Sequence, residues 1–409
     1  MLGALKDYKQ LPASLLYLIV AQYGVAIAHT SFITYLPLFA KLVGYSDSEY
    51  ALFTSYRWIG PLLFSFLLAI YIKGRRILPL IKIAYLTVPI SAFLVLVGYQ
   101  SNNETLIITC NIINGLAYGM TQVMVIPYIY RNTPKEKRIM ATTLFIMAFP
   151  ISNVFANAFV STFNFINPHL FNELNLLVSM TCISLLLALL IFKTDKQEQV
   201  PVKPSNKNQL LDYDWPAIRI ALIPHMFFLL GVGLIIPFIA LFFANTFNMS
   251  TSTYALLAFL SSSLVATFSI FAPKIKSTIG FKKAIPGTQI IAIIALIIMA
   301  STEHYSHLPI AVVIASGFFI IRQPFMFLAI PMTTDLTMNY LGEKNREMGT
   351  GLQTLIASAM GYCSALLFAF LRNNNISYSN IFYLTSILYV FALIGYKVLY
   401  HRYSKQQKY

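Results

Sequence analysis

The sequence predicts an all-α membrane protein with twelve transmembrane helices arranged as two six-helix bundles. Its composition is the first reason, because 57% of the 409 residues are hydrophobic and only 11% are charged, whereas soluble globular proteins carry roughly 25% charged residues. Such a chain has too few charges to cover soluble surfaces, so a bilayer must cover the rest. Disordered, collagen-like and coiled-coil chains are excluded as well, because each needs a polar, glycine-periodic or charge-rich composition.

Twelve apolar runs are each long enough to cross a bilayer, whose core of about 30 Å requires roughly 20 residues of helix. In chain order the predicted spans are 13–40, 49–72, 78–99, 104–130, 138–165, 172–192, 216–245, 251–275, 283–301, 308–334, 346–371 and 377–400. Several contain proline, including Pro127, Pro150 and Pro331. Membrane helices tolerate proline where neighbouring groups satisfy the freed backbone, so we expect bends at these points.

The distribution of basic residues predicts the orientation of the spans. Of the 29 Lys and Arg, 25 fall on one side of this layout, only Lys41 and Arg372 fall on the other, and Arg57 and Arg322 lie within spans. Short loops rich in Lys and Arg stay in the cytoplasm. We therefore expect both termini to be cytoplasmic and the chain to lie in the cytoplasmic (inner) membrane, with the first helix retained. The net charge of +15 then reflects topology and does not indicate a nucleic-acid partner.

Two homologous halves are predicted on either side of a polar linker. The longest polar break, residues 193–215, separates a first bundle at 1–192 from a second at 216–409. Similar segments recur at nearly constant spacing: 46–52 with 250–256, 74–76 with 280–283, and 138–144 with 346–352. Because each half has an even number of spans, the halves are expected to be parallel repeats related by an axis along the membrane normal, as in some secondary transporters.

The loop after the second span of each half resembles a motif of the major facilitator superfamily. That family has Gly-x-x-x-Asp-x-x-Gly-x-(Arg/Lys) there, and its end is matched by Gly74, Arg75 and Arg76, with Gly280, Lys282 and Lys283 in the second half. The resemblance covers nearly the whole chain as topology. It implies a secondary transporter in which these loops act in gating and the two halves rock around a substrate site.

The chain departs from that family at three positions associated with drug and proton antiport. The motif's Asp is Tyr71, the fourth helix has Asn111 before Gly115 where relatives often have Arg, and Phe149 precedes Pro150 where antiporters have Gly. Efflux of amphiphilic drugs by proton antiport is therefore the alternative function.

Arg57 and Arg322 are expected near the middle of the membrane, one in each half. An arginine there costs at least about 2.5 kcal/mol on insertion scales, so such residues usually face a cavity or pair internally. All fourteen Asp and Glu fall in loops or at span ends. One reading is therefore structural, with backbone carbonyls or a span-end acid as partners. The other is an anionic or zwitterionic solute bound between the two halves, because a guanidinium forks onto carboxylate or phosphate.

Other polar residues at helical spacing predict a hydrated path through the first half. The candidates for substrate binding beside the two arginines are Gln22 and His29 in the first span, Asn111, Asn114 and Tyr118 in the fourth, Asn153 and Asn157 in the fifth, and Gln323 beside Arg322. Amides also join helices to each other, and His29 could equally be a hydrogen-bonded structural residue. Candidates for proton coupling are His29, His225 and Asp335, since an imidazole with an ordinary pKa near 6.5 suits that task.

Other function classes find little support in the sequence. There is no Walker-type glycine loop for ATP, the three cysteines lie in apolar runs, and the group Glu303, His304 and His307 lacks a clear fourth metal ligand. No catalytic constellation stands in the loops and no charged ring lines a pore, which argues against an enzyme and a channel. We expect no cofactor and no metal. The expected partners are a small-molecule substrate, a coupling proton or ion, and the lipid bilayer, with the chain acting as a monomer.

Overall fold

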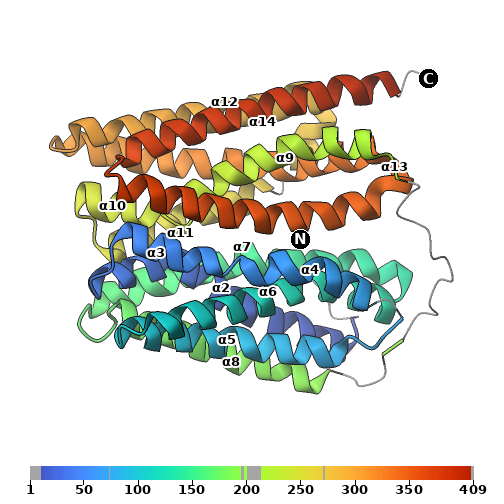
Figure 1. The fold of residues 1–409 in the computed structure, drawn as a ribbon, viewed down its shortest axis with the longest axis horizontal. Coiled ribbons are helices and arrows are strands. Elements are labelled where there is room, and N and C mark those ends of the chain that lie inside the picture. The colour runs from blue at the N-terminus through green and yellow to red at the C-terminus, as the bar shows by residue number, and fades with distance from the viewer. Residues whose placement is uncertain (1–10, 73, 195–197, 200–212, 270–271, 407–409) are drawn as a thin grey trace. The chain divides into compact units, whose positions relative to one another are not determined.

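The computed structural model describes residues 11–72, 74–194, 198–199, 213–269 and 272–406, and within these ranges the regular structure is entirely helical. The ribbon in Figure 1 accordingly contains coils and no arrows. Twelve of its helical segments are long and apolar enough to cross a membrane. The predicted fold class is therefore confirmed, and each of the twelve predicted spans overlaps one of these segments.

The chain divides into two compact units. The first comprises Met1–Tyr45 and Phe53–Ser205, and the second comprises Ser46–Leu52 and Asn206–Tyr409. The division at residue 205 falls within the predicted linker, most of which (195–197 and 200–212) lies outside the described residues. The predicted boundaries at 192 and 216 themselves stay a prediction.

The helices of the first unit build six spans, of which the second is interrupted. Its elements are α2 (Ala13–Leu42), the part of α3 (Asp47–Tyr56) that begins at Phe53, α4 (Ile59–Tyr71), α5 (Leu78–Gln100), α6 (Glu104–Asn132), α7 (Lys135–Ile166), α8 (Glu173–Ala188) and the 3-10 helix η1 (Leu189–Lys193). The second span is made of α3 and α4, which are separated by a break at Arg57 and Trp58. The break places the backbone and side chain of Arg57 outside a regular helical turn in the middle of a span.

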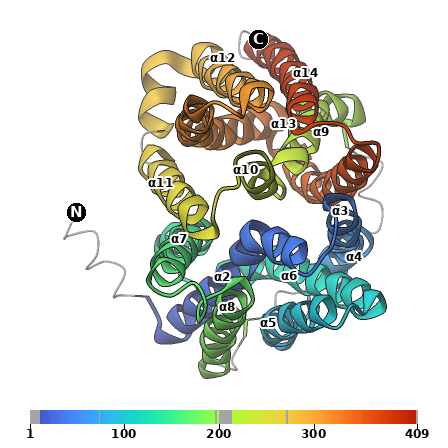
Figure 2. The ribbon, with the colours of Figure 1, turned by 90° about the vertical axis from the view of Figure 1, so that its left-hand side faces the viewer.

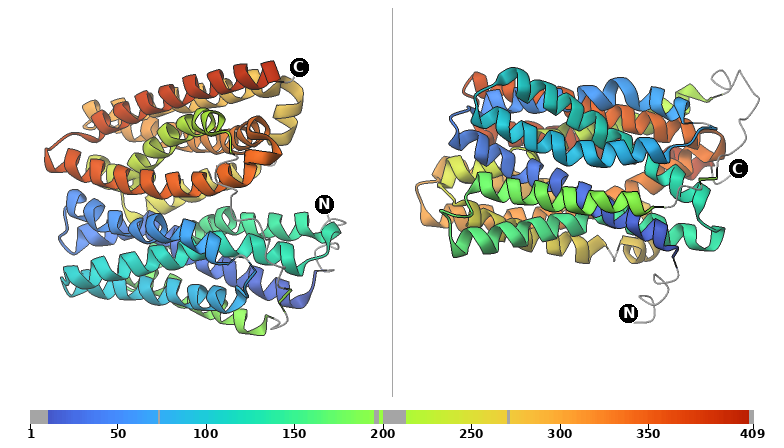
Figure 3. Two further views of the ribbon diagram at one scale, coloured as in Figure 1. Left: turned by 45° about the vertical axis from the view of Figure 1, so that its right-hand side comes forward. Right: turned by 90° about the horizontal axis from the view of Figure 1, so that it is seen from below.

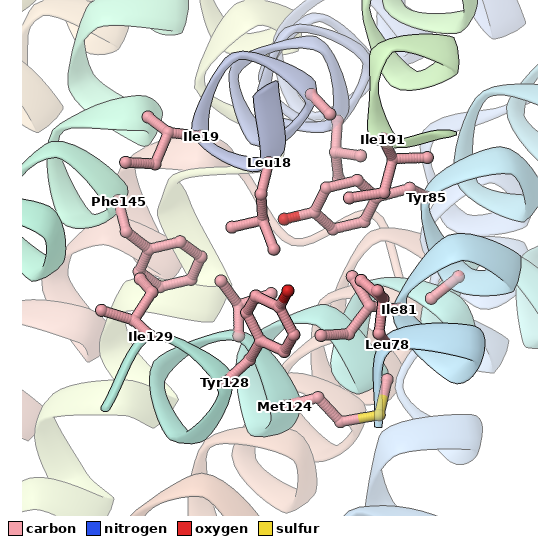
Figure 4. Close-up of a cluster of buried hydrophobic side chains, with 14 of the residues drawn as sticks. Leu18, Ile19, Leu78, Ile81, Tyr85, Met124, Tyr128, Ile129, Phe145 and Ile191 are labelled. Carbon is pink, nitrogen blue, oxygen red and sulfur yellow. The ribbon is translucent and has the colours of Figure 1, made fainter. Parts of the chain in front are cut away.

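A cluster of buried apolar side chains joins the helices of the first unit. Figure 4 shows Leu18 of α2 at its centre, facing Tyr85 of α5 and Tyr128 of α6. Ile191 of η1 and Phe145 of α7 close the cluster on two sides. Lipid tails are as apolar as leucine, so close van der Waals packing, rather than escape from water, holds such helices together. This packing fixes the rotation of α2 and α6, on which His29 and Tyr118 lie.

The second unit also builds six spans, and here the first is interrupted, between α9 and α10. Its elements are α9 (Trp215–Ile235), α10 (Ile239–Phe247), α11 (Thr251–Ser269), α12 (Ala272–Ser301), the 3-10 helix η3 (Thr302–Tyr305), α13 (Pro309–Asn373) and α14 (Tyr378–Gln406). The run of α13 holds two spans, Pro309–Gly342 and Met348–Asn373, on either side of Gly342. Figure 2 looks along the helices and shows α12 beside α13 and α14 beside α9. Figure 3 shows from two further sides that the helices within each unit run side by side.

Three glycines with left-handed backbone angles lie where a helix ends or where a helical run is interrupted. Gly74, Gly280 and Gly342 have φ angles of 65°, 68° and 67°. A side chain with a Cβ rarely adopts such angles, whereas glycine adopts them readily. Two of these positions, Gly74 and Gly280, are glycines of the motif-like loops identified from the sequence.

Each end of the linker is anchored to the unit that it adjoins. In the first unit, Glu198 accepts a hydrogen bond from the backbone N–H of Ile77, with an N to Oε2 distance of 2.9 Å. In the second, the Asp214 carboxylate accepts from the backbone N–H of Ala217 at 3.0 Å, capping α9. The backbone N–H of Asp214 donates to the side chain of Asn345, also at 3.0 Å. Both anchors supply acceptors to amides at or near helix N-termini, which helices leave without partners.

Candidate functional site: two arginine clusters

The first cluster brings together three of the predicted site residues. Arg57 Nη2 lies 2.8 Å from His29 Nδ1, and the His29 ring stacks on the Tyr118 ring with centroids 3.6 Å apart and planes inclined by 6°. The ring of Phe149 lies 6.1 Å from that of His29. The His29 side chain is buried with 8% of its surface exposed, and Arg57 is half-buried. A cation, an imidazole and a phenol from three separate spans therefore meet inside the first unit.

A glycine on α6 positions Arg57. A Cβ built at Gly115 would lie only 1.6 Å from the backbone oxygen of Arg57, so the break between α3 and α4 touches α6 where α6 has no side chain. The next turn of α6 repeats the close approach, because a Cβ at Gly119 would lie 3.0 Å from the ring of Pro61. This contact brings the Arg57 side chain to the level of Tyr118, one turn of α6 beyond Gly115.

The contact between Arg57 and His29 fixes the protonation of the imidazole. A guanidinium has only donors, so Nδ1 of His29 must be the acceptor and the ring must carry its proton on Nε2. A proton added to Nδ1 would remove this acceptor and place two positive charges beside each other. The geometry thus links the arrival of a proton at His29 to the position of the Arg57 side chain.

The remaining polar candidates of the first unit fall into different environments. The Oδ1 atom of Asn157 accepts from the hydroxyl of Tyr35 at 2.7 Å, and its Nδ2 donates to Asn153 at 3.3 Å. Asn114 instead donates to Ser91 on α5 at 3.0 Å and to the Val88 carbonyl, which joins two helices.

Asn111 donates to the Ile107 carbonyl of its own helix at 3.0 Å. Gln22 is buried, and its Oε1 has no hydrogen-bond partner. Asn114, by contrast, connects α6 to α5 through its two hydrogen bonds, as amides that join membrane helices do.

The second cluster surrounds Arg322, which is fully buried in the second unit with 0% of its surface exposed. Its Nη2 lies 3.3 Å from the Tyr389 hydroxyl and 3.2 Å from the Met326 sulfur. The Nε and Nη1 atoms have no hydrogen-bond partner. Met326 and Tyr389 line a cavity of about 10 Å³ together with Gln289, whose amide atoms also lack partners. A cavity of that size has room for about one water-sized group.

The other predicted residues of the second unit have different surroundings. Gln323 is half-buried and its Oε1 lacks a hydrogen-bond partner. His225 is half-buried on α9. Asp335 accepts from Asn339 on its own helix at 2.9 Å. Of the two groups of candidates, the structure therefore brings together those around His29 more closely than those around Arg322.

The loop between α4 and α5 is held by an acid that the sequence analysis did not single out. Arg131 of α6 donates to the carbonyl oxygen of Arg75 at 2.8 Å and pairs with Glu198 at 3.3 Å. The Arg75 guanidinium lies 4.1 Å from the centre of the Tyr71 ring, at the position where the family motif has Asp. Arg76, like Lys282 and Lys283 of the second unit, is exposed. Glu198 thus supplies the loop with a carboxylate from the linker.

Tyr389, Met326 and Gln289 also escaped the sequence analysis. Tyr389 is one of 25 tyrosines, so its residue type alone did not distinguish it. Gln289 carried a usable signal, because it is the only amide in the apolar run 284–300. Among the described residues, no group of three or more His, Cys, Asp and Glu could hold a metal ion. Glu303 instead accepts hydrogen bonds from the backbone and side chain of Ser379.

The fold is similar to solved transporter structures at low sequence identity. A bacterial homologue of the human lysosomal transporter spinster is 15% identical, covers 96% of this chain and 97% of that chain, and has a TM-score of 0.69. A D-xylose–proton symporter is 15% identical with coverage of 93% and 96% and a TM-score of 0.68. The nucleoside transporter NupG is 14% identical with coverage of 95% and 99% and a TM-score of 0.68.

No curated protein sequence matches the chain. The family model of the major facilitator superfamily matches residues 16–366, which is more than half of the sequence. The protein therefore belongs to the major facilitator superfamily and is a multi-pass membrane transporter.

Proposed function

We propose that the protein is a secondary active transporter that moves a small anionic or zwitterionic solute across the cytoplasmic membrane by alternating access. Arg57 of the first half and Arg322 of the second half both recognise the negative group of the solute. His29 and Tyr118 orient the solute in the first half, and His29 carries the coupling proton.

The burial of Arg322 among neutral groups is the observation that carries this proposal. Its hydrogen-bond contacts are a phenol and a thioether, and neither neutralises a cation. An ionised group taken out of water without compensation costs several kcal/mol, and at this depth the membrane adds to that cost. A carboxylate or phosphate oxygen that accepts from Nε or Nη1 would give one of these donors a partner and neutralise the cation, through a charge-assisted hydrogen bond.

The Arg57 cluster offers chemistry suited to the same class of solute. The guanidinium lies beside an imidazole that stacks on a phenol ring, so a charged donor, a ring face and a hydroxyl are close together. The solved neighbours include proteins described as D-xylose–proton and nucleoside transporters. These support a small polar solute as the class of substrate, while the negative charge is inferred from the two arginines alone.

Ligand-induced thermal stabilisation of the purified protein tests the charge of the solute. A ligand that binds only the folded state raises its apparent stability by about 2.7 kcal/mol at a hundred times its Kd. We expect organic anions and sugar phosphates to raise the Tm of the wild type, and Arg57→Ala and Arg322→Ala each to remove that shift. Lys41→Ala, which removes an exposed cation, is the matched control and should keep it. Stabilisation by cationic dyes that survives both arginine substitutions would instead favour drug efflux.

Substitution of His29 by glutamine tests the coupling proton. Glutamine offers an amide oxygen to Arg57 in place of Nδ1 but does not titrate. We expect His29→Gln in proteoliposomes to keep solute counterflow and to lose accumulation driven by a pH gradient by at least roughly tenfold, or about 1.4 kcal/mol of coupling. Gradient-driven accumulation at the wild-type level would contradict this role and move the proton to His225 or Asp335.

A further inference from the structure

We propose that a groove between α12 and α14 of the second unit binds one anionic phospholipid, with its phosphate at Lys282, Lys397 and His401. The groove has a volume of about 750 Å³. Figure 2 shows the two helices as neighbours. This site lies within the second unit alone and does not depend on the identity of the transported solute.

The basic residues of the groove lie at the depth of a lipid headgroup. Lys397 lies about 19 residues, or roughly 28 Å, beyond the first residue of α14, which is nearly the thickness of a bilayer core of about 30 Å. Lys282 lies close to the start of the span Thr278–Tyr305 on the neighbouring helix. Because both residues line one groove, the start of one span and the end of the other meet at the same membrane interface.

Helical spacing gives the groove two continuous walls. On α12, Lys282, Pro286 and Ile290 recur every four residues, and on α14, Ile394, Lys397 and His401 recur at intervals of three and four. Residues so spaced lie on one face of a helix. Each wall therefore passes from a basic residue at the interface to an isoleucine deeper in the membrane.

The charge of the groove selects an anionic lipid over a neutral one. Among the described residues of its lining are Lys282, Lys397 and His401, and no Asp or Glu. Basic pockets between transmembrane helices on the cytoplasmic side are suited to anionic headgroups, and each basic residue near the surface adds to the attraction. The basic side chains lie on the side where 25 of the 29 Lys and Arg of the chain gather, which is the predicted cytoplasmic side.

The apolar part of the groove provides a surface for the acyl chains of the lipid. The side chains of Ile290 and Ile394 are 45% and 53% exposed, and both lie in the wall of the groove. Tyr400 and Ser404, also in the lining, lie with the basic residues and offer hydroxyl groups. A free phosphate would use only the basic end, whereas a phospholipid uses the basic end and the isoleucines together.

Neutralisation of the two lysines tests the proposal. In Lys282→Gln/Lys397→Gln both exposed cations are replaced by a good helix former. The matched control is Lys283→Gln/Arg402→Gln, which removes the same charge from adjacent exposed positions outside the groove. Each protein is purified, stripped of lipid and titrated with phosphatidylglycerol, phosphatidylcholine or inorganic phosphate while its Tm is followed. Native mass spectrometry counts the lipids that remain bound.

We expect phosphatidylglycerol to raise the Tm of the wild type and of the control, and one lipid to stay bound to each. The groove variant should bind phosphatidylglycerol roughly thirtyfold more weakly, since each basic residue contributes about 1 kcal/mol at a membrane surface. Three results would overturn the proposal: equal affinity in the groove and control variants, an equal shift with phosphatidylcholine, or the full shift with inorganic phosphate alone.

Discussion

Replacing Gly115 with alanine should destabilise the first unit by about 3 kcal/mol or more, at the upper end of the cost of overpacking. The added Cβ would lie 1.6 Å from the backbone oxygen of Arg57. A backbone atom cannot rotate aside as a flexible side chain can, so α6 and the break between α3 and α4 would have to separate. Thermal unfolding of the purified protein measures the loss of stability, and proteoliposome uptake should fall with it.

Gly317→Ala is the matched control for this substitution. Gly317 also lies within a transmembrane helix, and a Cβ built there meets nothing within 4 Å. Alanine is favoured over glycine in a helix by up to about 1 kcal/mol, so the control should have an unchanged or higher Tm. A wild-type Tm and full transport in Gly115→Ala would show that the contact between α6 and Arg57 is not needed.

Arg322→Met should separate stability from solute binding. Methionine fills much of the volume of arginine without its charge, and replacement of buried ionic groups by apolar side chains is often neutral or stabilising by about 1–4 kcal/mol. Because Arg322 has 0% exposure and two nitrogen atoms without hydrogen-bond partners, we expect the Tm to stay level or rise. Binding of the anionic solute should fall below detection. Thermal unfolding and ligand titration on the same preparation provide the measurements.

Tyr389→Phe serves as the graded comparison. It removes the hydroxyl that lies 3.3 Å from Arg322 Nη2 and leaves the guanidinium in place, so binding should weaken by only about 1–3 kcal/mol, the cost of one lost partner. A marked loss of stability in Arg322→Met with solute binding intact would contradict the proposed role of the arginine.

The membrane spans could be predicted from the sequence because they depend on local composition. A run of about 20 apolar residues is recognisable without knowledge of its neighbours, and α5, predicted at 78–99, is found at Leu78–Gln100. The interruption of the second span at Arg57 was not predicted. It depends on close contact with Gly115, which lies more than fifty residues away in the sequence, and no local pattern records that contact.

The sequence indicated which residues belong to the candidate site, but it did not indicate which of them contact each other. Helical spacing placed Asn114 and Tyr118 on one face of α6, yet Asn114 bonds to Ser91 of α5 while Tyr118 stacks on His29. Spacing defines a face but not the helix that it meets. Glu198 was missed for the same reason, since the Ile77 amide that it binds lies in another part of the chain.

Each half of the transporter binds its own end of the linker through hydrogen bonds. Glu198 holds one end to α5 and Arg131, and Asp214 holds the other to α9 and Asn345. A cut or an insertion between positions 200 and 212 therefore breaks none of these bonds. The two halves can therefore be expressed as separate polypeptides divided at that point. Each polypeptide retains the hydrogen bonds that anchor its own terminus.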